Sequence, residues 1–467
     1  MRGIQITSQT SLVRAMGRLA IPNLAEEFLM LAVGWTDWYL AGHWIGTDAS
    51  KAAMGLLGYI MWLLPNSFVA VSIGALALIA RYVGAGNRSG AELIAKQSLM
   101  AGLALAGFLT VACYFLGDSL IGIMQLRGEA AELASSYLAL LVPIIPLIML
   151  EKVGTACLHG SGDTVTGFVA RCFVATINLL ASFSLMTGSF GLPELGWLGL
   201  AWGTAIGHST GALIIAAALV SRRSGLWRGT SGWWIQWPII RRIFNIGLPA
   251  EFDVMALLGG QFVFLAMINS LGTAAAAAHS LAIQIEACAY LPGSAFQVAA
   301  ATMTGQLLGA GDKARARKAG LVCLFFGGIV ICLSGVVIYL FGEQLGVLFV
   351  GSNDPGTTQK AGELLRIVAF AMPSLATVMI LSGALRGAGD TRLPFVYTMI
   401  GLVGVRLPLT LFLSFQFPLA GLFPEFALQG IALGVAGGWY AMLSDLVVRS
   451  ALFTHRFLGG HWVHRIV

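Results

Sequence analysis

The chain has 467 residues, of which 57% are hydrophobic and only 10% are charged. Soluble domains carry about 25% charged residues, so this composition excludes an ordinary soluble globular protein, which would expose far too much apolar surface. The net charge of +6 is not a nucleic-acid signal, because its distribution along the chain explains it.

Apolar stretches long enough to cross a membrane recur along the whole chain. A helix needs about 20 residues to cross the hydrocarbon core of a bilayer. The sequence therefore predicts an all-α integral membrane protein with twelve transmembrane helices, over residues 19–42, 53–79, 97–117, 131–152, 165–188, 197–220, 245–270, 274–301, 319–341, 363–384, 394–415 and 429–453.

The basic residues predict the orientation of these helices. With the N-terminus in the cytoplasm, 22 Lys and Arg residues, including Arg171 and Arg449, are counted on the cytoplasmic side and 4 on the other, while Arg406 lies inside a helix. Cytoplasmic loops of membrane proteins carry such an excess of Lys and Arg. Both termini are therefore expected in the cytoplasm, and the first apolar stretch reads as an uncleaved span.

The second half of the chain repeats the first. The motif LHGSGDT at 158–164 recurs as LRGAGDT at 385–391, and GAGN at 84–87 recurs as GAGD at 309–312. Pro22 recurs as Pro249, and the offsets lie between 225 and 227 residues. Parallel repeats in an apolar chain are typical of transporters. We expect two six-helix lobes, 1–220 and 245–467, joined by a cytoplasmic linker, 221–244, whose Trp and Arg residues suit a membrane surface.

The glycine loops and the cysteines have structural explanations. The loops at 84–86 and 309–311 follow apolar helices rather than strands, which favours tight turns over phosphate binding. Asp163 and Asp390 are expected to cap the helices that follow them. The six cysteines form no CxxC pair and are expected to pack as small apolar residues.

Acidic residues inside the predicted helices carry the functional signal, because each is costly there. The first helix contains Glu26, Glu27 and Asp37. Glu26 and Asp37 are eleven residues apart, so they project from one face about 16 Å apart along the axis. Asp37 lies toward the outer half and is expected to bind a proton or a cation. For Glu26 and Glu27, an ion pair or a hydrogen bond between helices is favoured over a functional role.

The second half is not a copy of this acidic pattern. Its first helix carries Glu251 and Asp253, and Asp253 is the repeat equivalent of Glu26, because each lies four residues after a helical proline. The position equivalent to Asp37 is occupied by Phe264. The acidic site is therefore predicted to be asymmetric and to lie deeper in the first half.

Other polar and aromatic side chains are weaker candidates. His279 is favoured as a packing residue that makes a hydrogen bond between helices. For Arg406 and Asp445, a functional role and pairing with other charges are both left open. Glu286 is a further acidic candidate. The candidates for lining a substrate cavity are Trp35, Tyr59, Met61, His279, Gln284 and Arg406.

Several ordered motifs together resemble one transporter family. They include residues 22–37, GQLLGAG at 305–311, GALRGAGD at 383–390, VRLP at 405–408 and WYAMLSD at 439–445. The chain resembles the multidrug and toxic compound extrusion (MATE) family, and looks most like its bacterial damage-inducible branch. The resemblance implies two six-helix lobes in a bacterial inner membrane, and antiport of organic cations against protons or sodium without a bound cofactor. We expect a monomer that binds small amphiphilic molecules and no nucleic acid.

The same resemblance assigns roles to individual residues. The first-helix aspartate of the family corresponds to Asp37, and the asparagine that works with it corresponds to Asn178. Ser182 stands where many relatives have a second aspartate. Leu257 and Leu375 stand where some relatives have acids in the second lobe. We therefore place the cation or proton site at Asp37, Asn178 and Ser182, with sodium as the only metal ion expected there.

Two other functions are considered. A flippase for lipid-linked oligosaccharides belongs to the same superfamily, but such proteins commonly need a strongly basic cavity, and only Arg406 is clearly in mid-membrane. A membrane-embedded enzyme would need a catalytic motif. HExxH does not occur, and the GxSxG match GHSTG at 207–211 lies inside a predicted apolar helix instead of the strand–turn–helix that this motif requires. Secondary transport is the better interpretation.

Overall fold

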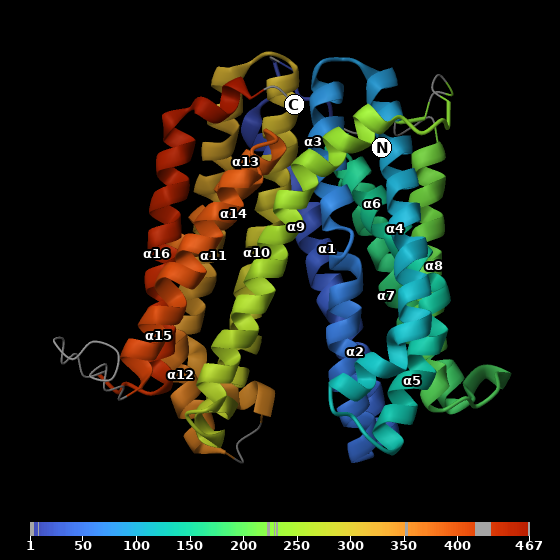
Figure 1. Cartoon of the computed structure of the whole chain (residues 1–467), viewed down its shortest axis with the longest axis vertical. Coiled ribbons are helices and arrows are strands. Elements are labelled where there is room, and N and C mark those ends of the chain that lie inside the picture. Colours follow the sequence, from blue (N-terminus) through green and yellow to red (C-terminus); the bar gives the residue numbers. More distant parts are fainter. Residues whose placement is uncertain are drawn as a thin grey trace. The chain divides into compact units, whose positions relative to one another are not determined.

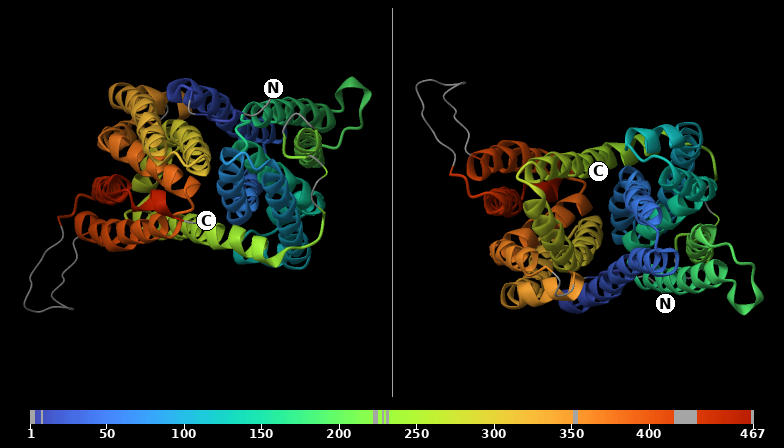
Figure 2. Two further views of the ribbon diagram at one scale, coloured as in Figure 1. Left: turned by 90° about the horizontal axis from the view of Figure 1, so that it is seen from above. Right: turned by 90° about the horizontal axis from the view of Figure 1, so that it is seen from below.

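The computed structural model describes residues 4–7, 9–221, 225–227, 229, 232–350, 354–415 and 431–465, which contain helices and no strand. They divide into two compact units: unit 1 holds Met1–Leu248 with Gly305–Asp312, and unit 2 holds Pro249–Thr304 with Lys313–Ile466. Within each unit most helices run side by side (Figures 1 and 2). The division falls inside a helix at 248/249, whereas the sequence places the lobe boundary in the linker.

Unit 1 begins with the six apolar stretches predicted in the first half, and all six are helical. Two of them are broken at prolines, after Pro65 and between Pro143 and Pro146, because proline removes a backbone donor and clashes with the preceding turn. The helices are α1 Leu12–Leu40, the π-helical turn η1 Ala41–Ile45, α2 Asp48–Asn66, α3 Val69–Gly84, α4 Arg88–Ile123, α5 Glu129–Leu141, α6 Ile145–Gly160, α7 Val165–Thr187 and α8 Trp197–Val220.

Unit 2 contains most of the helices predicted in the second half of the chain. The helices are α9 Trp237–Asn269, α10 Thr273–Gly309, α11 Lys313–Val350, α12 Pro355–Ala369, α13 Met372–Gly387, α14 Arg392–Met399, the π-helical segment η4 Ile400–Arg406, α15 Leu407–Ser414 and α16 Val435–Gly459. The α12–α13 pair bends by 56° just before Pro373. In the part of the chain that the structure describes, eight helices, or nine counting this pair, are long and apolar enough to cross a membrane. The predicted stretch at 429–453 begins outside the described residues.

The repeated glycine motifs form tight turns, as predicted. Gly86 and Gly311 have φ values of 73° and 79°, which place them in the left-handed region that favours glycine. Asp163 caps α7 by accepting a hydrogen bond of 3.1 Å from the Thr166 amide. Asp390 differs from the prediction: its carboxylate accepts from Arg456 at 2.7 Å and also pairs with Arg465.

The duplication extends to one side-chain contact. In unit 1, Glu26 lies 3.4 Å from His159 Nε2; in unit 2, the equivalent Asp253 lies 2.5 Å from Arg386. His159 and Arg386 hold the same position in the repeated LxG motif. In each unit, a carboxylate in the middle of the first long helix therefore contacts the last turn of the helix that carries the LxG motif.

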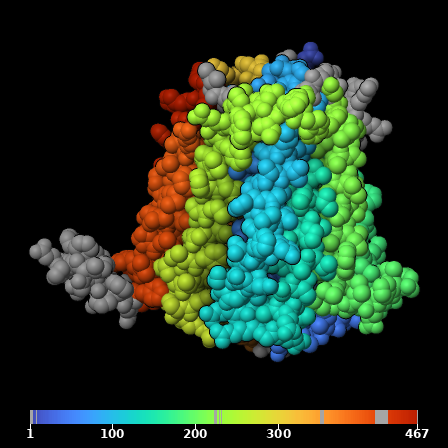
Figure 3. Space-filling view, turned by 45° about the vertical axis from the view of Figure 1, so that its right-hand side comes forward, coloured from blue at the N-terminus to red at the C-terminus, as the bar shows by residue number. Residues whose placement is uncertain are grey.

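The linker is anchored on α4 over its described residues. The Lys96 ammonium lies 4.8 Å and 5.4 Å from the ring centroids of Trp227 and Trp233, and it pairs with the buried Glu92 at 2.9 Å. The Gln97 amide donates to the Trp234 carbonyl at 2.7 Å. Figure 3 shows this yellow-green segment across the end of the blue helix α4. Residues 222–224, 228, 230 and 231 lie outside the described part of the linker.

Two repeated glycines allow backbones to touch within unit 1. A Cβ atom on Gly84 would overlap the backbone of Gln306, and one on Gly309 would overlap the backbone of Arg81. The side chain of Gln306 also accepts a hydrogen bond of 3.0 Å from the Ile6 amide. The end of α10 therefore packs against the end of α3 without a side chain between the two backbones.

Replacing Gly84 by Val is expected to destabilise the protein by roughly 1–3 kcal/mol, because an overpacked contact must move backbone atoms. Gly107→Ala is the matched control, since a Cβ on Gly107 meets no atom within 4 Å. Thermal unfolding of both variants in the same detergent gives the comparison. Equal midpoints would contradict the close contact.

Candidate functional site

Four helices of unit 1 meet at Asp37. The residue is 6% exposed, and its Oδ2 atom accepts a hydrogen bond of 3.0 Å from the Thr204 hydroxyl of α8. The same hydroxyl lies 2.9 Å from the Tyr137 hydroxyl of α5 and 3.2 Å from the Asn178 amide nitrogen of α7. A Thr hydroxyl has one hydrogen and two lone pairs. When Thr204 donates to Asp37, it can accept from both Tyr137 and Asn178.

Three buried oxygens at the predicted site have no hydrogen-bond partner among the described residues. They are Asp37 Oδ1, Asn178 Oδ1 and Ser182 Oγ. Buried polar atoms are nearly always paired, and hard cations prefer oxygen ligands. A proton on Asp37 or a small cation would supply the missing partner. The donor set therefore fits the proton or sodium site predicted from the sequence.

Glycines on α8 bring Asn178 and Ser182 close to Thr204. A Cβ atom on Gly203 would overlap Ser182, and one on Gly207 would lie 3.1 Å from the Asn178 Cβ. Because neither position has a side chain, α7 and α8 approach closely enough for the 3.2 Å contact between Asn178 and Thr204. The small residues on α8 thus position the polar groups of α7.

The other acidic candidates lie apart from the Asp37 site. Glu26 and Asp253 are engaged by His159 and Arg386. Glu27, Glu251 and Glu286 are partly buried. In the described residues, no group of three or more His, Cys, Asp or Glu side chains is arranged to hold a metal ion, and the six cysteines are free thiols.

Unit 2 has a basic group where unit 1 has its acid. Phe264, the equivalent of Asp37, is buried, and the Arg406 guanidinium lies 5.8 Å from its ring centroid. Arg406 ends the π-helical segment η4 and pairs with Asp445 at 2.7 Å. The sequence left open whether these two residues pair with other charges, and the structure shows that they pair with one another. Arg449, which charge sorting put at the cytoplasmic side, is buried and holds the other oxygen of Asp445 at 2.6 Å.

The residues predicted to line a substrate cavity do not lie together in the structure. Trp35 lines a pocket of about 600 Å³ in unit 1, together with Tyr39, His43, Trp44 and Phe183. Tyr59 and Gln284 are exposed and Met61 is partly buried. His279 accepts a hydrogen bond of 3.2 Å from the Trp439 indole, as expected for a packing residue.

Sequence reasoning missed several polar residues of unit 1. Thr204 and Tyr137 complete the Asp37 site, and a buried cluster joins Glu151, Arg171 and His208. Glu151 and His208 lie inside predicted apolar helices, so the cost of intramembrane charge was a usable signal for them. Arg171 was sorted to the cytoplasmic side, but it lies inside α7.

The comparisons with known proteins agree with this architecture. The MatE family model matches residues 22–184 and 249–412, once in each half and at the offset of the repeat. The chain is 28% identical to the probable multidrug resistance protein NorM of Thermotoga maritima, over 96% of this chain and 93% of that protein. It is 26% identical to the multidrug resistance protein PmpM of Pseudomonas aeruginosa, over 98% and 95% of the two chains.

A solved structure has the same fold. An outward-facing multidrug resistance MATE family transporter superposes with a TM-score of 0.85 at 21% identity, covering 97% of each chain. This supports an integral membrane protein of twelve transmembrane helices in two bundles. The family model covers well over half of the described sequence, and the chain therefore belongs to the MATE family of membrane transporters.

Proposed function

We propose that this protein exports cationic or amphiphilic small molecules across the bacterial inner membrane by antiport with protons or sodium. The observation that carries the proposal is the buried Asp37 carboxylate, whose Oδ1 has no hydrogen-bond partner among the described residues. The names of the relatives, multidrug resistance proteins, support the substrate class. We further propose that the lobes 1–220 and 245–467 move against one another, with both termini in the cytoplasm.

The coupling of ion and substrate movement is explained by their competition for the negative charge of Asp37. A carboxylate at Asp37 attracts either the coupling ion or a cationic substrate. Ion and substrate must favour different conformations or exclude one another, because a ligand with equal affinity for both states shifts no equilibrium. Ion binding from outside therefore accompanies substrate release, and ion release inside prepares the site for the next substrate.

The flippase alternative has less support. Arg406 and Arg449 are buried, and Asp445 engages both guanidinium groups within unit 2. A cavity for an anionic lipid-linked sugar needs basic groups that remain available to the substrate. Cation antiport at Asp37 is the better proposal.

Proteoliposomes test the proposal and identify the ion. Protein is reconstituted with trapped ethidium, and a pH gradient or a sodium gradient is imposed separately. One of the two gradients is expected to drive ethidium transport well above the rate of protein-free liposomes. Transport at the protein-free rate under both gradients would contradict antiport.

A further inference from the structure

Buried charged groups continue from the Asp37 site toward the cytoplasmic end of unit 1. His208 lies one turn after Thr204 on α8. Its Nδ1 atom is 2.7 Å from Glu151 Oε2 of α6, and Glu151 Oε1 is 2.8 Å from Arg171 of α7. The side chains of these three residues are at most 14% exposed. Three helices therefore meet at a second polar centre, directly beside the first.

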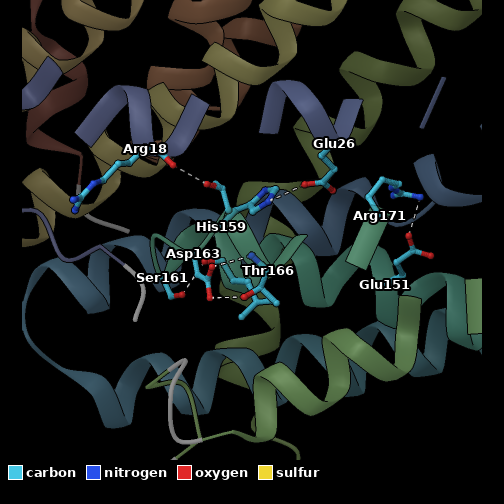
Figure 4. A network of polar contacts seen from close by, with 10 residues as sticks. Arg18, Glu26, Glu151, His159, Ser161, Asp163, Thr166 and Arg171 are labelled. Atoms are coloured by element: carbon cyan, nitrogen blue, oxygen red, sulfur yellow. Dashed lines mark hydrogen bonds and ion pairs between the residues drawn. The ribbon is translucent and has the colours of Figure 1, made fainter. Parts of the chain in front are cut away.

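These buried charged residues extend as far as the turn that follows α6. Arg171 interacts electrostatically with Glu26 and Glu27 of α1, and Glu26 lies 3.4 Å from His159 on the last turn of α6. Figure 4 shows the Arg171–Glu151 and Glu26–His159 pairs in one view. His208 interacts electrostatically with Asp37. The His208–Glu151 pair is therefore intermediate between Asp37 and the turn.

A structural role explains only part of this cluster. Glu151 and Arg171 balance one another, and a buried pair of this kind needs no third ionisable group. A histidine held by a carboxylate is, however, the side chain whose charge changes most readily near neutral pH. In the neutral form, Nδ1–H donates to Glu151 and leaves Nε2 as a proton acceptor.

We propose that His208 and Glu151 form a second proton-binding site in unit 1, which receives the proton that Asp37 releases. This inference rests on the proposed antiport at Asp37. In the transfer, the Asp37 O–H bond breaks and an N–H bond forms at His208 Nε2. The Asp37 carboxylate keeps its hydrogen bond from Thr204, and the imidazolium is held by Glu151. Release toward the cytoplasm breaks the new N–H bond and restores neutral His208.

Charged groups surround the His208–Glu151 pair. They are Asp37 on α1, Lys152 on α6 and Arg171 on α7. Further ionisable groups on elements packed against α8 include Tyr137 on α5, which bonds to Thr204, His43 on η1, which stacks on Tyr39, and His159 on α6, which lies near Glu26. Because transfer from Asp37 creates a carboxylate beside the imidazolium, the net charge of the buried region is unchanged.

Proton release on substrate binding tests the proposal. Detergent-purified protein in weak buffer is mixed with tetraphenylphosphonium, and a pH-indicator dye reports the released protons between about pH 5 and 8, where histidine titrates. His208→Asn is expected to lower the release by roughly half near neutral pH and to flatten its pH dependence. Its side-chain amide can still donate to Glu151, so a merely structural role would be preserved. His455→Asn, an exposed histidine on α16, is the matched control.

The outcomes separate this proposal from the function on which it rests. Wild-type proton release by His208→Asn at every pH, with release lost in Asp37→Asn, would overturn the second site and leave antiport intact. Sodium-driven transport without any proton release would do the same. Wild-type release and wild-type transport by Asp37→Asn would instead overturn the proposed function. If His208→Asn does not fold, His208→Gln is measured in the same assay and judged by the same criteria.

Discussion

Asp37→Asn is expected to reduce gradient-driven export to the rate of protein-free liposomes, while the protein still folds and inserts. The amide oxygen of Asn can keep the hydrogen bond from Thr204, which is 3.0 Å long in the wild-type protein. What is lost is the ability to take up a proton or to neutralise a cation. Without a group whose occupancy differs between states, the ion gradient cannot bias the conformational equilibrium.

The experiment measures efflux and binding on the same preparation. Substrate binding by Asp37→Asn is expected to persist in weakened form, because apolar and aromatic walls supply much of the affinity for such ligands. Asp118→Asn is the matched control: Asp118 also accepts a hydrogen bond from a hydroxyl, Ser135 at 2.6 Å, but it is exposed. Wild-type efflux and ion dependence in Asp37→Asn would show that Asp37 is structural and would direct attention to Glu26, Glu27 and Asp253.

The sequence predicted the features that follow from composition and repetition. A charge inside an apolar helix is costly, so Asp37 could be selected without a structure. The repeat of Pro22 at Pro249 predicted the equivalence of Glu26 and Asp253, and each of them pairs with the same position of the LxG motif. These predictions rest on spacing along one helix or between two copies.

The partners of these residues could not be predicted in the same way. Thr204 is one of many hydroxyl residues on apolar helices, and only the packing of α8 against α7 and α1 brings it to Asp37. Arg171 lies six residues into α7, a depth at which a basic residue can still be counted with a cytoplasmic loop. Counting basic residues by side therefore predicted an orientation, but it assigned Arg171 and Arg449 to the cytoplasmic side although both lie inside helices.

Asp445→Asn is expected to destabilise the protein by about 3–5 kcal/mol, because removing one partner of a buried ion pair leaves uncompensated charge. Here the loss is shared by two guanidinium groups, since Arg406 and Arg449 both contact Asp445 at 2.6–2.7 Å and all three residues are at most 4% exposed. The neutral amide can accept a hydrogen bond from one arginine, but it balances the charge of neither.

Thermal and denaturant unfolding in one detergent measures this effect. Glu343→Gln is the matched control, because the Glu343–Arg366 pair has side chains that are 43% and 51% exposed, and pairs of that kind contribute about 0–1 kcal/mol. Replacing Asp445, Arg406 and Arg449 together by Leu or Met is expected to recover most of the stability, as apolar substitutes do for other buried ion pairs. If the triple variant is stable but inactive, the basic centre of unit 2 serves transport. If Asp445→Asn instead unfolds at the wild-type midpoint, the two arginines do not depend on Asp445 for their charge balance.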